Sequence, residues 1–171
     1  MEPISHDTPD ELARALGEQL LARRWMMGTA ESCTGGRIAA AMTSLSGSSA
    51  YFAGGIVSYS NEVKRRVLGV LAESLVQYGA VSRDVVEQMA QGAIEALGVD
   101  CAVATSGIAG PTGGTPDKPV GTVWIAAALK DQTHSACFHF QGDRHQIMSQ
   151  ATCEALRLLL SLFANLCVED A

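Results

Sequence analysis

The stretch CAVATSG, residues 101 to 107, decides the class of fold to which this chain belongs. It is short and apolar and ends in glycine, which is the pattern of a parallel strand buried on both faces of a sheet. Such strands are typical of α/β domains, in which helices cover both faces of the sheet. The stretch therefore predicts helical segments before and after it in the sequence.

Periodic patterns on both sides of this strand supply those helices and further strands. Apolar residues recur at helical spacing after a capping box at Thr8 to Glu11 and again before Gly98. The expected helices cover residues 8–25, 36–44, 62–68, 72–78 and 84–97, with a last helix capped by Asp143; the expected strands cover 27–30, 54–60, 101–107, 120–129 and 133–141. We predict one α/β domain over residues 1–171, with its core at about 8–165. Its mixed β-sheet is flanked by helices on both faces.

Length, charge and cysteine usage limit the class of protein. The net charge of −6 argues against non-specific nucleic-acid binding, which needs a basic patch. The five cysteines are widely spaced and contain no CxxC pair, so they indicate neither a disulfide framework nor a zinc ribbon. The N-terminus lacks a signal-peptide pattern, and no apolar run approaches the roughly 20 residues of a membrane span. We expect a cytoplasmic homo-oligomer that binds neither nucleic acid nor membrane.

The loop TAESCTGGR, residues 29 to 37, contains an acid, two hydroxyls, a thiol and two glycines between a strand and a helix. Gly35 and Gly36 expose backbone N–H groups, as anion-binding loops do. Tight turns alone would explain the glycines of any one loop. However, SGSSAYFAGGIVSYSNEVK and TSGIAGPTGGTPDKPVGT are two more loops of this kind, and three in one small chain favour a functional site.

Cys33 is one candidate nucleophile, because it precedes a predicted helix N-terminus, where the pKa of a thiol is lowered. Together with Glu31 and Lys64 it would complete a Glu-Lys-Cys amidase arrangement. The alternative is a small buried side chain that packs behind the loop, which is the commoner place for cysteine. From the residues alone we favour the packing role.

A second candidate constellation lies in the middle loop, where Ser49, Tyr59 and Lys64 fall within sixteen residues. A serine hydroxyl needs a base to take its proton, and a lysine kept neutral by burial or by a nearby cation can act as that base. A tyrosine can relay the proton or position the lysine. These residue types are common, so a loop serine, a strand tyrosine and a solvated lysine are the simpler interpretation until geometry is known.

The remaining polar residues predict no metal site but include one anion contact. His6, His134, His139 and His145 lack the spacing and the carboxylate partners of a metal cluster. Arg144 follows a glycine turn at the start of the last helix, where anions bind readily. It would contact a phosphate or a carboxylate, or else form a surface ion pair.

Several motifs in order, TAESCTGG, GSSAYFAGGIVSYSNEVK, GAVS, SGIAGPTGG and KPVGTVWIA, resemble the CinA C-terminal domain family. The resemblance runs from about Leu12 to Phe163. Stand-alone bacterial members of this family are nicotinamide-nucleotide amidases, which convert nicotinamide mononucleotide to nicotinic acid mononucleotide and ammonia in pyridine-nucleotide salvage. The resemblance therefore implies a pyridine nucleotide as the small-molecule partner, and neither a metal nor a redox cofactor.

The same resemblance implies roles for individual residues. It places the nucleophile on Ser49 and the base on Lys64, with Tyr59 beside them. It makes Ser32 a residue that binds or orients the substrate, and it adds Ser106 and Arg144 to the site. The substrate-binding set is then Ser32, Thr34, Gly35, Gly36, Ser106, Gly107 and Arg144, with loop N–H groups holding the phosphate and the oxyanion. The alternatives are a thiol amidase that uses Cys33 and a non-catalytic, competence-associated nucleotide-binding module.

Overall fold

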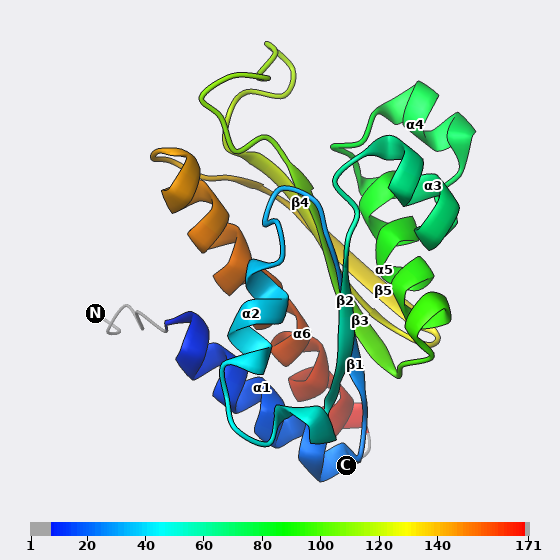
Figure 1. The fold of residues 1–171 in the computed structure, drawn as a ribbon, viewed down its shortest axis with the longest axis vertical. Coiled ribbons are helices and arrows are strands. Elements are labelled where there is room, and N and C mark those ends of the chain that lie inside the picture. The colour runs from blue at the N-terminus through cyan, green and yellow to red at the C-terminus, as the bar shows by residue number, and fades with distance from the viewer. Residues whose placement is uncertain (1–7, 170–171) are drawn as a thin grey trace.

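The computed structural model of the chain describes residues 8–169, and the side chains of residues 8–166. His6 and the ends of the predicted domain lie outside the described residues. The described part forms six α-helices, one 3-10 turn and one five-stranded sheet (Figure 1). The elements are α1 (Pro9–Arg23), β1 (Met27–Glu31), α2 (Arg37–Thr43), η1 (Ser48–Ala50), β2 (Phe52–Val57), α3 (Asn61–Leu68), α4 (Ala72–Tyr78), α5 (Arg83–Leu97), β3 (Cys101–Gly107), β4 (Thr122–Leu129), β5 (Gln132–His139) and α6 (Arg144–Glu169).

The strand order in the sheet is β2-β1-β3-β4-β5. β1 pairs in parallel with β2 and with β3, whereas β4 and β5 add two antiparallel strands beyond β3. The stretch CAVATSG is β3, and six of its seven residues are buried, as expected for a strand between two layers of helices. The predicted α/β fold with a mixed sheet is therefore confirmed.

Helices cover both faces of the sheet, which Figure 1 shows nearly edge-on. One core packs α1, α2 and α6 against side chains such as Val103 and Ile125, and the other packs α5 and its neighbours against Ala104 and Ala126. Alternate residues of each strand face opposite cores, because successive strand side chains point to opposite faces. The same alternation decides which face of the sheet the first residues after a strand point to.

α6 is the one described helix that is long and apolar enough to cross a membrane by length and composition, with a mean hydropathy of 1.2 over its best window. It also packs as a core helix, since Ile147, Ala151, Leu156 and Leu159 are buried against the sheet and α1. A sequence scan for an uninterrupted apolar run misses this helix, because Glu154 and Arg157 interrupt it. Its start follows the expectation: the Asp143 carboxylate accepts a hydrogen bond from the Gln146 N–H at 2.9 Å.

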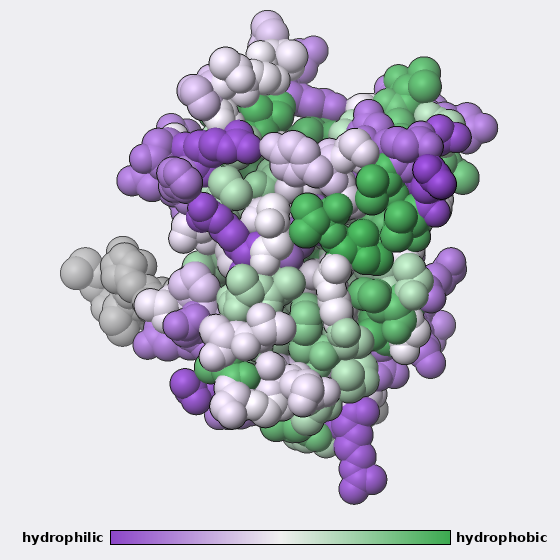
Figure 2. All heavy atoms as spheres, in the orientation of Figure 1, coloured by the Kyte–Doolittle hydropathy of each residue, from purple (hydrophilic) through white to green (hydrophobic). Residues whose placement is uncertain are grey.

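β2 is an edge strand, so one side of its backbone faces away from the sheet. The nearby surface is apolar: Val57, Val67 and Leu71 are large hydrophobic residues that are exposed. Figure 2 shows apolar surface gathered over the region of β2 and α3. Apolar patches are common where proteins contact other molecules, and the expected homo-oligomer stays a prediction.

Candidate active site

The carboxyl ends of the three parallel strands meet at one edge of the sheet, where α/β folds place their sites. Ser32 follows β1, Ser58 and Tyr59 follow β2, and Ser106 and Gly107 end β3. α3 adds Lys64 to this edge and α6 adds Arg144. Most of the predicted site residues are therefore brought together, with one important exception.

Lys64 is the most unusual side chain at this edge, because a lysine is almost never fully buried and this one is 1% exposed. Its Nζ donates hydrogen bonds to the Ser58 carbonyl oxygen at 2.7 Å, the Ser32 Oγ at 3.1 Å and the Tyr59 carbonyl oxygen at 3.3 Å. Every proton of the ammonium thus has an acceptor. Burial lowers the pKa of Lys64 from its ordinary value, as expected when a charged amine leaves water.

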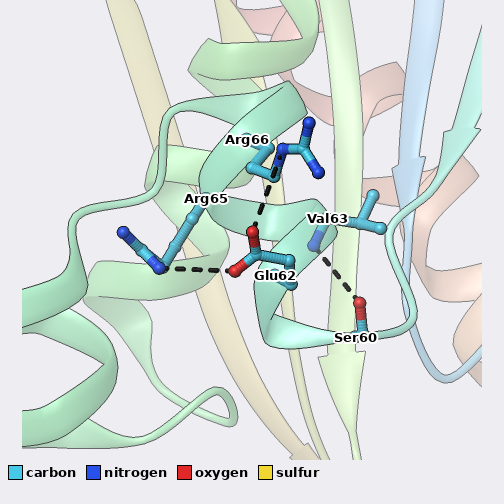
Figure 3. A network of polar contacts seen from close by, with 5 residues as sticks. All are labelled: Ser60, Glu62, Val63, Arg65 and Arg66. Carbon is cyan, nitrogen blue, oxygen red and sulfur yellow. Dashed lines mark hydrogen bonds and ion pairs between the residues drawn. The ribbon is translucent and has the colours of Figure 1, made fainter.

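The start of α3 fixes where Lys64 points. Ser60 caps the helix by accepting a hydrogen bond from the Val63 N–H at 3.2 Å (Figure 3). On the exposed side of the same turn, Glu62 pairs with Arg65 at 3.4 Å and with Arg66 at 3.8 Å. With its charged residues facing solvent, α3 turns Lys64 inward to the strand ends.

The opposite side of α3 is held tightly against α5. Leu68 is buried in the core that these helices share, and a Cβ atom on Gly92 would collide with the Leu68 carbonyl oxygen. Only glycine allows this close approach of the two helices. The position of Lys64 is therefore fixed by a cap at one end of α3 and by backbone packing at the other.

The expected pair of Ser49 and Lys64 is not formed. Ser49 lies in η1, which comes before β2, whereas Lys64 follows β2. The five residue steps of β2 at about 3.3 Å each separate the two ends of the strand by about 17 Å. Ser49 is also exposed at the opposite edge of the sheet. Within this chain the hydroxyl that meets Lys64 belongs to Ser32 instead, so the geometry favours Ser32 over Ser49 as the partner of Lys64.

Tyr59 and Arg144 form a bridge across the same edge. One guanidinium nitrogen of Arg144 donates to the Tyr59 hydroxyl at 3.0 Å, and the other donates to the Gly110 carbonyl oxygen at 2.9 Å. Tyr59 is 61% exposed, and its contact with Lys64 is made by its carbonyl and not by its phenol. A proton relay through the Tyr59 hydroxyl therefore does not fit the geometry, whereas a role in positioning does.

Ser106 lies beside Ser32 across the sheet, because Glu31 and Thr105 are register partners and each serine follows one of them. Its buried hydroxyl donates to the Ala80 carbonyl oxygen at 2.7 Å, which ties β3 to the turn before α5. Gly107 packs so closely that a Cβ atom would lie 2.6 Å from a Val123 methyl carbon. Both residues therefore shape the site, and the Ser106 hydroxyl already has a protein partner.

Glu31 is buried at the end of β1, and its hydrogen-bond partners are not those of the Glu-Lys-Cys alternative. Its carboxylate accepts hydrogen bonds from the Thr34 hydroxyl at 2.7 Å and from the N–H groups of Ile38 and Ala39 at 2.9 and 3.0 Å. Strand alternation directs Glu31 and the next residue, Ser32, to opposite faces. A Glu-Lys-Cys arrangement does not fit this geometry, because the Glu31 carboxylate is hydrogen-bonded to Thr34 and to the start of α2.

Glu31 also occupies donors at the start of the helix that follows. The cap position of α2 is Gly36, and the Thr34 hydroxyl is buried between Glu31 and Thr105. The N–H groups at the start of α2 that would bind an anion are occupied by the Glu31 carboxylate. Gly35 and Gly36 both have positive φ values, 58° and 100°, and their backbone remains near the site surface.

Cys33 packs in the core on the α2 side of the sheet. Burial raises the pKa of its thiol to about 11, with only a smaller opposing contribution from the nearby Thr105 hydroxyl. A thiol with this pKa is almost wholly protonated at neutral pH, and the protonated form is a weak nucleophile. The packing interpretation of Cys33 is the one that fits the structure.

Sequence reasoning missed Ser58, whose backbone carbonyl accepts the shortest hydrogen bond of Lys64. A backbone contact carries no side-chain signal, so no pattern would have revealed it. Among the described residues, no three His, Cys, Asp or Glu side chains are grouped closely enough to hold a metal ion. The polar groups at this edge are suited to proton transfer and hydrogen bonding.

Comparisons with known proteins add to this geometry. The CinA C-terminal domain family matches residues 9–163. A nicotinamide-nucleotide amidohydrolase PncC from Escherichia coli is 49% identical over 156 residues, which cover 90% of this chain and 93% of that protein. The protein of the same name from Pseudomonas putida is 49% identical over 162 residues, which cover 95% and 98% of the two chains.

Solved structures agree with the sequence relatives. A competence-damaged protein (CinA) superfamily protein from Escherichia coli has a TM-score of 0.90 and 38% identity, and the match covers 95% of this chain and 94% of that one. The competence damage-inducible protein A from Klebsiella pneumoniae has a TM-score of 0.89 and 40% identity, with 92% and 98% covered. The similarity therefore extends over nearly the whole of each chain.

Proposed function

The chain belongs to the CinA C-terminal domain family, and from this premise we propose that it hydrolyses the carboxamide of nicotinamide mononucleotide, with Ser32 as nucleophile and Lys64 as base. The products are nicotinic acid mononucleotide and ammonia, a reaction of pyridine-nucleotide salvage. Relatives that match over nearly their full length are named nicotinamide-nucleotide amidohydrolases. The observation that carries the assignment is the 3.1 Å contact between the buried Lys64 amine and the Ser32 hydroxyl.

The partners of Lys64 favour its action as a base. A neutral amine has two N–H groups and one lone pair, and two backbone carbonyls, of Ser58 and Tyr59, are in place to accept the two N–H groups. The lone pair then faces Ser32, whose O–H donates to it. When the proton moves to Lys64, the new ammonium keeps both carbonyl acceptors. The lowered pKa of Lys64 provides the neutral form that this step requires.

The reaction then follows the order of a serine amidase. The Ser32 oxygen attacks the carboxamide carbon as its proton passes to Lys64, and the tetrahedral oxyanion is held by backbone donors. The C–N bond breaks as Lys64 returns the proton to the leaving nitrogen, which departs as ammonia. Water, deprotonated by Lys64, then attacks the acyl ester and releases the acid and Ser32.

The other residues at this edge bind and orient the substrate. Arg144 retains further N–H groups beyond those on Tyr59 and Gly110, and its positive charge suits a phosphate-bearing substrate. Gly35 is exposed and Gly36 is half-buried, and Gly107 allows the end of β3 to lie against Val123. Ser106 ties this strand end to the turn before α5. Tyr59 contributes its carbonyl to Lys64 and its phenol to Arg144.

Two alternative functions can be distinguished from the proposed serine amidase. A thiol amidase would need Cys33 ionised, which the raised pKa of about 11 opposes. A non-catalytic nucleotide-binding module would have no reason to bury a lysine against a serine hydroxyl. The test is release of ammonia by the purified protein from nicotinamide mononucleotide, the riboside and the dinucleotide. Turnover of the mononucleotide is expected, whereas binding without any product over long incubation would contradict the proposal.

A further inference from the structure

We propose that Arg83, Lys118 and Trp124 form the subsite that binds the phosphate of the nucleotide substrate. The proposal rests on the proposed function, because it takes nicotinamide mononucleotide as the substrate. Lys118 and Trp124 belong to the motif KPVGTVWIA, and Arg83 directly follows the motif GAVS. The reaction at Ser32 leaves both motifs without a role. The evidence is the position, the charge and the hydrogen bonding of an open pocket beside Ser106.

The pocket has a volume of about 470 Å³ and lies between the start of α5 and β4. Arg83, Lys118 and Trp124 line it, together with Tyr78 and Asp84. Arg83 is exposed, and Lys118 and Trp124 are half-buried. A ligand in the pocket can therefore reach all three side chains without any movement of the backbone.

The pocket lies on the same face of the sheet as the candidate catalytic residues. Ser106 and Trp124 are register partners in the antiparallel strands β3 and β4, so their side chains share a face. The Ser106 hydroxyl donates to the carbonyl of Ala80, in the turn that leads to the pocket. Neighbouring strands are about 4.8 Å apart, so the ends of β1 and β4 lie about 10 Å apart. A pyridine ring and a ribose span this distance, which places the phosphate in the pocket when the carboxamide lies at Ser32.

The loop before β4 fixes Lys118 at the rim of this pocket. Its N–H donates to the Thr115 hydroxyl at 3.1 Å, and its carbonyl accepts from the Thr115 N–H at 2.9 Å. Its Nζ donates to the Tyr78 carbonyl at 2.6 Å. Gly79 allows this approach, because its φ is 77° and a Cβ atom there would lie 3.2 Å from the Nζ. Among the described residues the Nζ has no second hydrogen-bond acceptor, so its other protons remain for a phosphate.

Arg83 supplies the second cation of the pocket. Its guanidinium carbon lies 5.8 Å from the centroid of the Trp124 ring, a cation–π contact. Within residues 8–166 its side chain takes part in no ion pair and no hydrogen bond. A guanidinium offers a planar set of donors that matches the oxygens of a phosphate. Arg83 thus presents its donors to the pocket while the indole of Trp124 supports it.

The charges around the pocket favour an anion. Arg83 and Lys118 contribute +2 and Asp84 contributes −1, so the pocket carries +1 in a chain whose net charge is −6. A local positive charge attracts a phosphate even in an acidic protein. Arg144 reaches this edge from α6, whose core lies on the other face of the sheet, and does not line this pocket. The pocket therefore distinguishes the mononucleotide from the riboside, which lacks the phosphate.

The first test compares kinetics with the mononucleotide and with the riboside. Arg83→Gln and Lys118→Gln are each expected to raise KM for the mononucleotide about 10-fold to 100-fold, with kcat within threefold, because a charged hydrogen bond far from the reacting carbon is lost. The kcat/KM of the riboside, or its inhibition constant if it is not hydrolysed, should stay within threefold. Lys130→Gln is the control, because Lys130 follows β4 at the other end of the strand. An unchanged KM for the mononucleotide in both variants, or an equal loss with the riboside, would overturn the proposal.

Asp84→Asn tests the sign of the charge effect. Removing this exposed carboxylate from the pocket should lower KM for the mononucleotide about twofold to fivefold, because a repulsion of the phosphate is lost. The riboside should show no such gain. A higher KM for the mononucleotide in Asp84→Asn would contradict an anion subsite.

Competition distinguishes the phosphate of the substrate from a separate anion effector. Ribose 5-phosphate should inhibit hydrolysis of the mononucleotide competitively, and its inhibition constant should rise at least tenfold in Arg83→Gln. Non-competitive inhibition would place the phosphate at a separate site and would overturn the proposal.

A binding measurement separates the subsite from the amidase assignment. The chain has two tryptophans, Trp25 and Trp124, so Trp25→Phe identifies the indole N–H resonance of each. Titration with ribose 5-phosphate should shift the Trp124 resonance, with a dissociation constant at least tenfold higher in Lys118→Gln. If Trp124 responds but no pyridine nucleotide is hydrolysed, the amidase assignment fails and the phosphate subsite is supported. No shift at Trp124, or equal dissociation constants in the variant and wild type, would overturn the subsite.

Discussion

Two serine-containing loops, residues 31–36 and 46–50, look alike in sequence and lie at opposite edges of the sheet. The first follows β1, so it shares an edge with the ends of β2 and β3. The second precedes β2 and is followed by Tyr51, which is buried against Gly17 of α1. The resulting environments differ: Ser32 meets a buried lysine, whereas Ser49 is exposed on a short 3-10 turn.

The edge of the sheet at which a loop lies therefore decides which residues it contacts, even when another loop is nearer in sequence. Ser49 is closer to Lys64 in sequence than Ser32 is, yet an intervening strand carries the chain from one edge of the sheet to the other. Ser32 is on a neighbouring strand whose carboxyl end meets the same edge. Loops at carboxyl ends of parallel strands are therefore the better candidates for a shared site.

The largest expected effect contrasts the two serines directly. Ser32→Ala should lower kcat/KM for nicotinamide mononucleotide about 10³-fold or more, because the nucleophile is lost. Ser49→Ala should leave it within about threefold. Ammonia release by both variants, with circular dichroism to check the fold, measures the contrast. The reverse pattern, with Ser49→Ala inactive and Ser32→Ala active, would contradict the assignment of Ser32 as nucleophile.

Lys64→Met should come next, with a loss of kcat of about 10³-fold, because no other base contacts Ser32. Methionine fills similar apolar space, so the variant should remain folded, and a thermal melt checks this. Lys64→Arg is the matched control for charge: its guanidinium stays protonated and should be equally inactive. Activity retained in Lys64→Arg would show that the base function is not carried by this side chain.

The pH dependence of wild-type activity tests the role of Lys64 as base. Burial lowers the pKa of Lys64, and only the neutral amine accepts the Ser32 proton. Activity should therefore fall as the pH is lowered through this pKa, and reach a plateau above it. A kcat/KM profile between about pH 5 and pH 10 measures the direction. A profile that rises toward acid would contradict the role of Lys64 as base.

Arg144→Met should have a smaller effect, mainly on binding. Loss of a charged hydrogen bond costs about 1.5–3 kcal/mol, so KM should rise about 10-fold to 100-fold. Arg157→Met is the control, since Arg157 pairs with Glu154 on the same helix away from the site. Steady-state kinetics on both variants gives the comparison, and an unchanged KM in Arg144→Met would exclude Arg144 from substrate binding.

The smallest effect is expected at Cys33. Cys33→Ala should change kcat less than threefold and lower the free energy of unfolding by about 1 kcal/mol, because only a buried thiol is lost. Thiol-directed alkylating agents should likewise leave activity intact at neutral pH, since the raised pKa keeps Cys33 protonated. Inactivation at a rate that follows alkylation of Cys33 would instead support the thiol amidase.

The sequence predicted much of the fold because its signals are local. The capping box at Thr8 to Glu11 and the apolar run of β3 specify their elements without long-range information. The contact of Ser32 with Lys64 depends on strand order, which no local pattern contains. The bridge from Arg144 to Tyr59 spans eighty-five residues of chain. The role of Glu31 as acceptor for the start of α2 could not be predicted, because a carboxylate that accepts from an N–H group seven residues later leaves no local cap signal.

The central claim, that Ser32 and not Ser49 is the nucleophile, is tested most directly by locating a covalent label. Trypsin cleaves after Arg24, Arg37 and Lys64, so Ser32 falls in peptide 25–37 and Ser49 in peptide 38–64. The protein is incubated with a fluorophosphonate and its peptides are analysed by mass spectrometry. The account predicts a single label on peptide 25–37 at Ser32, absent from Lys64→Met. A label on peptide 38–64 at Ser49 would contradict it.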